Sequence, residues 1–95
     1  MTGRPKTIAV VIRTRDLHRV SEALRAAIGL GLRGDHIEVF AARESSAAMS
    51  SDEPRIVRAI GTLRELGHGI VDERDIGSPD LRSVLANADA VEVWT

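Results

Sequence analysis

The chain contains no cysteine among its 95 residues. Disulfides, thiolate nucleophiles, zinc ribbons and cysteine-ligated iron–sulfur clusters are therefore excluded, because each of them needs a cysteine sulfur. Small extracellular domains usually depend on disulfides for their stability. We therefore predict a cytoplasmic protein.

Aromatic side chains are almost as scarce, since Phe40 and Trp94 are the only Phe, Tyr or Trp residues. Proteins that bind single-stranded nucleic acid stack the bases on aromatic platforms, and two isolated rings make a poor platform. The net charge of -1 provides no general attraction to a phosphate backbone. We expect no nucleic-acid partner.

Long hydrophobic runs are also missing. The basic first residues are followed by an apolar run that extends only from Ile8 to Ile12. That is the length of a strand and far short of the roughly 20 residues that span a bilayer. We expect no membrane association and no secretory signal. With 43% hydrophobic residues in 95 positions, residues 1–95 are predicted to form a single globular domain.

Short apolar runs alternate along the chain with segments of helical periodicity. The first run is apolar on both faces, which is typical of a central strand in a covered parallel sheet. The last run alternates apolar and polar residues, which is typical of an edge strand. The runs predict strands over 7–13, 36–42, 68–72 and 90–94.

The periodic segments predict three helices. Asp16 suits the N-cap of the first helix, and Gly34 suits the position that ends it. Ser50 and Glu53 have the spacing of a capping box for the second helix. The third is expected to start at 78–80, with Ser78 as its cap, Pro79 at its first position and Asp80 against the helix dipole. The small polar segment 43–51 is expected to be a loop.

This alternation predicts an α/β fold with a mainly parallel sheet of four strands and right-handed crossovers. Placing the most apolar strand in the middle and the alternating strand at an edge gives the strand order 3-2-1-4.

Charged and polar residues follow the predicted ends of the first three strands. Open α/β sheets bind ligands beyond the carboxyl ends of their strands, where arginines gathered near the first helix would hold an anion. Alternatively, the arginines pair with Glu44, Glu73 and Asp75 and have no further role. The candidate ligand-binding residues are Arg13, Thr14, Arg15, His18, Arg43, Glu73 and Arg74.

The histidines and glycines give no cofactor or metal site. His36 and His68 begin adjacent predicted strands, but two histidines without a nearby carboxylate do not make a metal centre. The G-x-G-x-x-G string at 29–34 closes a helix, whereas dinucleotide sites need it to follow a strand and open a helix. No motif marks Ser45 or Ser46 as a nucleophile, so we assign no catalytic residue.

The last predicted strand indicates an interface. Trp94 lies near the end of the sequence, where little chain remains to cover it, and Val91 and Val93 occupy the other face of the strand. Exposed tryptophans on edge strands are usually buried against a partner. We therefore expect a homo-oligomer, a dimer or trimer. The alternative is that the segment 43–51 folds over the ring, with Met49 as its apolar contact.

Three segments resemble the DsrE/DsrF-like family, which includes the sulfur-relay Tus proteins. Residues 16–40, DLHRVSEALRAAIGLGLRGDHIEVF, are similar to the family's first helix and second strand. Residues 56–71, IVRAIGTLRELGHGIV, are similar to its second helix and third strand, and 88–95, ADAVEVWT, to its closing strand. The resemblance implies a three-layer α/β/α sandwich and assembly into dimers or higher oligomers.

The resemblance also locates a departure from the family. Its active members carry persulfide sulfur on a cysteine just after the third strand, a place that falls here at 72–75, DERD. The first hypothesis is therefore a non-catalytic subunit that acts through assembly with itself or with a protein partner. The second is a domain that binds a small anion or a nucleotide-like ligand at the strand ends. The third is an enzyme that uses His18 with Glu73 or Asp75.

Overall fold

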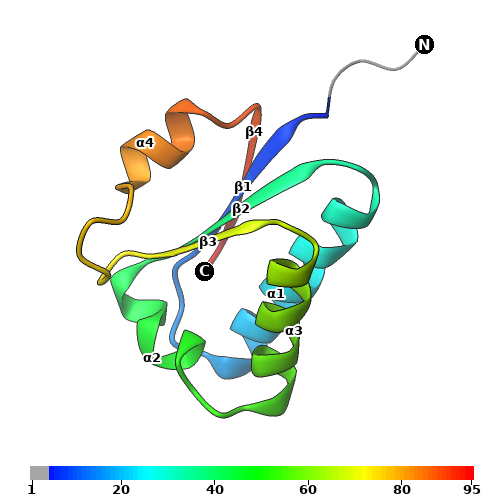
Figure 1. Cartoon of the computed structure of the whole chain (residues 1–95). Helices are drawn as coiled ribbons and strands as arrows, with labels where there is room; N and C mark the ends of the chain where they lie inside the picture. Colours follow the sequence, from blue (N-terminus) through cyan, green and yellow to red (C-terminus); the bar gives the residue numbers. More distant parts are fainter. Residues whose placement is uncertain (1–4) are drawn as a thin grey trace.

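A four-stranded parallel sheet organises residues 5–95, which are the residues that the computed structural model describes. Its order, β3-β2-β1-β4, confirms the predicted order 3-2-1-4. β1 is central and pairs with β2 and β4 in parallel register (Figure 1). The strands are β1 (Thr7–Ile12), β2 (His36–Ala41), β3 (Gly69–Asp72) and β4 (Ala90–Trp94).

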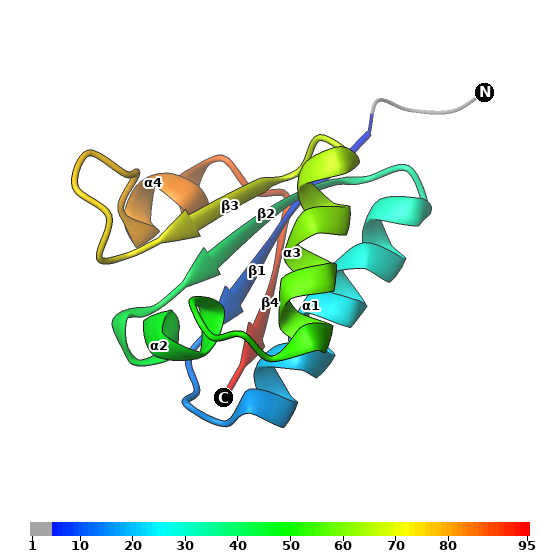
Figure 2. The ribbon, with the colours of Figure 1, turned by 60° about the horizontal axis from the view of Figure 1, so that its bottom comes forward.

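Helices cover both faces of the sheet, so the α/β architecture is the predicted three-layer one. The helices α1 (Leu17–Leu32) and α3 (Pro54–Glu65) lie side by side on one face, and α4 (Leu81–Ala86) lies on the other (Figures 1 and 2). A short helical pair, η1 (Arg43–Ser45) and α2 (Ser46–Met49), follows β2 at the carboxyl edge of the sheet. Within residues 5–95, no helix is both long and apolar enough to cross a bilayer.

The two faces of the sheet are buried to different extents. On the α1 and α3 side, a large cluster packs helix residues such as Leu24 and Ile56 against alternate strand residues such as Val10. On the α4 side, the cluster is small, because α4 has six residues and buries only Val84. The β4 side chains on this face of the sheet are therefore exposed to solvent.

The segment 43–51, expected as a loop, is largely helical. Its residues Ser45 and Ser46 are completely buried. The expectation failed because small polar residues are typical of loops, whereas here both hydroxyls are satisfied inside the protein. The Ser45 hydroxyl accepts the Thr14 N–H at 2.9 Å and lies 2.7 Å from the Thr14 carbonyl oxygen. The Ser46 hydroxyl donates to Asp72 Oδ1 at 2.6 Å.

Two helix starts also differ from the prediction. Glu53 caps α3, and its carboxylate accepts the N–H groups of Arg55 and Ile56, so Ser50 plays no part. Pro54 occupies the first turn, which makes the residue before it the cap. Asp80 caps α4 through a 2.9 Å bond from the Ser83 N–H, because a charged oxygen is a strong acceptor at a helix start.

We predict that Ser45→Ala destabilises the fold by about 1–3 kcal/mol, because it leaves the part-buried Thr14 N–H without an acceptor. Urea unfolding at pH 7 measures the change. Ser50→Ala is the matched control, since Ser50 is exposed and, among residues 5–95, hydrogen-bonds only through its backbone. Equal stability of the two variants would contradict the prediction.

Candidate functional site

An open hollow of about 590 Å³ lies at the carboxyl edge of the sheet. Three of its lining residues are arginines, and they come from three neighbouring connections: Arg15 follows β1, Arg43 follows β2 and Arg74 follows β3. Because parallel strands end at the same edge, residues distant in sequence converge here. The other lining residues are Glu44, Ala47 and Ala48.

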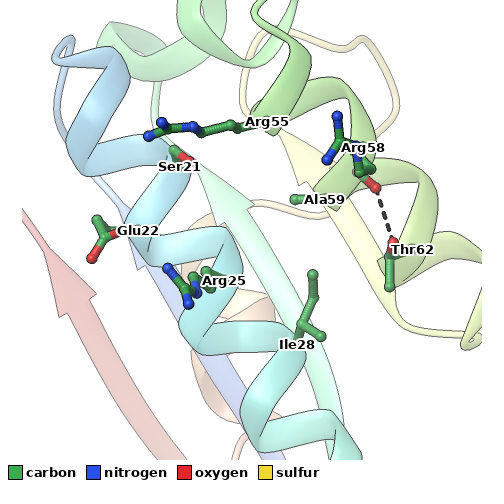
Figure 3. Close-up of a pocket in the computed structure, with 8 residues that line it drawn as sticks. All are labelled: Ser21, Glu22, Arg25, Ile28, Arg55, Arg58, Ala59 and Thr62. Atoms are coloured by element: carbon green, nitrogen blue, oxygen red, sulfur yellow. Dashed lines mark hydrogen bonds between the residues drawn. The ribbon is translucent and has the colours of Figure 1, made fainter.

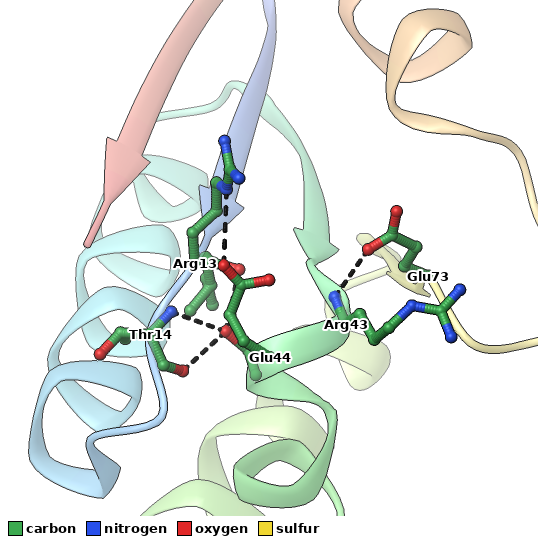
Figure 4. Close-up of polar contacts among 7 residues, drawn as sticks. Arg13, Thr14, Arg43, Glu44 and Glu73 are labelled. Atoms are coloured by element: carbon green, nitrogen blue, oxygen red, sulfur yellow. Dashed lines mark hydrogen bonds and ion pairs between the residues drawn. The ribbon is translucent and has the colours of Figure 1, made fainter.

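Three carboxylates at this edge, those of Glu44, Glu73 and Asp72, are engaged by other groups, and Asp75 forms no ion pair with a residue in 5–95. Glu44 pairs with Arg13, with 3.7 Å between Arg13 Nε and Glu44 Oε2. Glu73 Oε1 accepts the backbone N–H of Arg43 at 2.7 Å, and it pairs with no arginine side chain of residues 5–95 (Figure 4). Asp72 accepts the Ser46 hydroxyl and the Arg74 N–H.

As a result, the guanidinium groups of Arg15, Arg43 and Arg74 form no ion pair with any residue in 5–95. The alternative of paired arginines therefore holds for Arg13 but not for these three. All three are exposed. Guanidinium groups match carboxylate and phosphate oxygens in bidentate geometry, so the hollow presents three charged donors to an incoming anion.

The other candidate residues lie away from this hollow or serve the backbone. The Thr14 hydroxyl accepts the Asp16 N–H at 3.2 Å. His18 lines a separate small hollow with Leu17, Ser21, Glu53 and Arg55. The start of α1 already holds a carboxylate, because Asp16 Oδ1 accepts the Arg19 N–H at 3.0 Å. An anion at this edge would therefore meet arginine side chains more readily than helix amides.

Sequence reasoning missed Ala47 and Ala48, which form the apolar part of the hollow's lining. Alanine carries no chemical signal of a site. The favourable helix propensity of the Ala47-Ala48-Met49 run was the one indication that this segment is a helix rather than a loop.

Trp94 lies on the face of β4 that is turned toward α1. Its ring packs against the larger core cluster, and the Arg19 guanidinium carbon lies 4.9 Å from the ring centroid. Trp94 Nε1 donates to Glu92 Oε1 at 2.9 Å. The ring is therefore covered by a cation–π contact from α1, and the segment 43–51 does not provide the stacking group. Val91 and Val93 remain 48% and 56% exposed on the opposite face.

His36 and His68 are neighbours, as expected, with ring centroids 5.7 Å apart. A carboxylate is present as well, because Glu38 hydrogen-bonds His36 Nε2. Within residues 5–95, however, no group of three His, Asp or Glu residues is arranged to hold a metal ion. Gly31 belongs to the G-x-G-x-x-G string and is needed for packing, since a Cβ there would collide with the His68 ring.

The surroundings of His68 favour its neutral form. Its Nδ1 accepts the Ile37 N–H at 3.1 Å, so the neutral ring carries its proton on Nε2. Burial, and then the neighbouring His36, lower the pKa of His68 below its usual 6.5, while Glu38 partly opposes them. Protonation of Nδ1 would also remove the acceptor for Ile37.

We predict that His68 weakens the fold in acid. Between the lowered pKa and 6.5, the unfolded chain binds the proton more readily than the folded chain, so stability falls as the pH drops below 6.5. His68→Asn keeps an acceptor near the Nδ1 position and does not titrate. Urea unfolding at pH 7.5 and pH 5 should show a larger loss for the wild type than for this variant. Identical losses would mean that His68 does not couple to folding.

No protein-family model, no curated protein and no solved structure matches this chain.

Proposed function

We propose that this protein binds a small organic anion, such as a phosphate ester or a nucleotide-like molecule, at the carboxyl edge of its sheet. The observation that carries the proposal is the convergence of Arg15, Arg43 and Arg74 on one hollow, where none of the three guanidinium groups pairs with a carboxylate of residues 5–95. The arginines would supply charge and directional donors to the anionic group.

The size and lining of the hollow favour an organic ligand over a bare ion. Ligand pockets usually measure about 300–1,000 Å³, and this hollow of about 590 Å³ falls in that range. The Ala47 and Ala48 side chains give the non-ionic part of a ligand an apolar surface. Glu44, on the rim, would accept a hydrogen bond from a ligand hydroxyl.

We predict that a nucleoside monophosphate raises the melting temperature of the wild type by about 5 °C or more at ten times its Kd. Arg43→Ala/Arg74→Ala should abolish the rise, because it removes two of the three unpaired guanidinium groups. Differential scanning fluorimetry measures both effects.

The control for this experiment is Arg33→Ala/Arg82→Ala, which removes the same charge from exposed positions outside the hollow. This control should keep the full response. A wild type that is not stabilised by the nucleotide or by inorganic phosphate would rule out the proposal. An equal loss of the rise in melting temperature in both double variants would show that the response depends on net charge and not on the hollow.

Assembly is a second candidate function, and a specific observation supports it. Val91 and Val93 lie exposed on the same face of the edge strand β4, where α4 does not cover them. Exposed apolar side chains on an edge strand are commonly buried by a partner. In this role the chain would be a non-catalytic, DsrE/DsrF-like subunit of a homo-oligomer. We propose the two valines as its contact residues, because Trp94 is already packed against α1.

If the chain assembles in this way, light scattering at micromolar concentration will give a mass above the 10.3 kDa of one chain. Val91→Thr/Val93→Thr should return it to the monomer mass, since threonine keeps strand propensity but adds a polar group. Val57→Thr, at a position 54% exposed on α3, should leave the mass unchanged. A monomeric wild type at high concentration would refute this second function.

A further inference from the structure

A groove runs between α1 and α3 on the outer surface of the two-helix layer (Figure 3). It consists of two adjoining hollows, of about 350 Å³ and 180 Å³, which share Ser21 and Arg55. The groove extends along α1 from Leu17 to Ile28. At 1.5 Å per residue this stretch measures about 16 Å, which is the length of about five residues of extended chain.

Arginines line both walls of the groove. Arg55 and Arg58 project from consecutive turns of α3, and Arg25 projects from α1. None of these guanidinium groups forms an ion pair with a described residue. Two acids also line the groove. Glu22, in the larger hollow, points its carboxylate away from α3 in Figure 3, and Glu53, in the smaller hollow, uses its carboxylate to cap α3.

Small and apolar side chains line the groove between the arginines. Ser21 and Ala59 are buried where the helices approach, and Ile28 lies at one end of the groove. Leu17, 45% exposed, lies at the other end beside His18. A ligand would therefore meet charge along the groove and an apolar side chain at each end.

We propose that this groove binds a short, extended, acidic segment of a partner protein, with carboxylates opposite Arg25, Arg55 and Arg58 and an apolar side chain at one end. Charge complementarity carries the assignment, because three unpaired cations on two facing walls match several carboxylates along one chain better than a single small anion. The groove contains no ring other than His18 on which a base could stack, so a peptide fits better than a single-stranded nucleic acid.

The experiment measures fluorescence anisotropy of a labelled peptide of five glutamates and one leucine, at about 50 mM salt to limit screening. Arg55→Glu/Arg58→Glu tests the groove. Both positions are exposed, and a glutamate in the first turn of α3 interacts favourably with the helix dipole, so the variant should fold. Circular dichroism confirms the fold. Arg33→Glu/Arg82→Glu is the matched control, because it reverses the same charge at exposed positions outside the groove and outside the sheet-edge hollow.

We expect the wild type and the Arg33→Glu/Arg82→Glu control to bind the peptide, and the groove variant to bind at least about tenfold more weakly. Four results would overturn the proposal: no binding by the wild type, equal loss in both variants, equal binding of a peptide with lysines in place of the glutamates, or tighter binding of an oligonucleotide at the groove. A groove variant that shifts from oligomer to monomer in light scattering would also overturn it, since a second copy would then occupy the groove.

Discussion

The buried hydroxyl of Ser45 fixes the relation between the first two strand ends. It accepts the Thr14 N–H after β1, and it lies within hydrogen-bonding distance of the Ile12 and Thr14 carbonyl oxygens. The neighbouring Ser46 hydroxyl extends this connection to Asp72 at the end of β3. The backbone that carries Arg15, Arg43 and Arg74 is therefore held by two buried serines. Long arginine side chains can define a site only if their backbone positions are fixed in this way.

The unequal layers of the sandwich explain why its surfaces differ in character. α1 and α3 together bury one sheet face, so their outer sides are free to carry charge, and arginines line the groove between them. The six-residue α4 cannot cover the other face, so Val91 and Val93 stay exposed there. The difference in helix length thus explains why strand side chains stay exposed on one side of the sheet, while on the other side the exposed side chains belong to the helices.

The sequence predicted the elements and the sheet order because these follow from local patterns. The doubly apolar run at 8–12 indicates a central strand, and the left-handed Gly34, with φ 102°, ends α1 as expected. Asp16 caps α1 as predicted, but the caps predicted for α3 and α4 were wrong, because carboxylates closer to each helix accept its first N–H groups. The loop predicted at 43–51 was wrong because the fold of this segment depends on tertiary hydrogen bonds such as that from Ser46 to Asp72. The candidate site was predicted in part, because the sheet topology brings Arg15, Arg43 and Arg74 together. No sequence pattern shows that Arg13 pairs with Glu44, or that His18 lines a separate hollow beside α3.

The use of the acidic side chains explains how a chain of net charge -1 retains unpaired arginines. Many carboxylates bind backbone N–H groups instead of cations. Asp16, Glu53 and Asp80 cap the three longer helices, Glu73 accepts the N–H of Arg43, and Asp89 accepts the N–H of Thr7. A carboxylate that accepts a backbone N–H is held in place by that hydrogen bond, so it cannot move toward an arginine. Among the described residues, Arg13 is the only arginine that pairs with an acid. The acids therefore stabilise the starts of helices and loops, while the arginines at the sheet edge and along the α1–α3 groove keep their donors available for ligands.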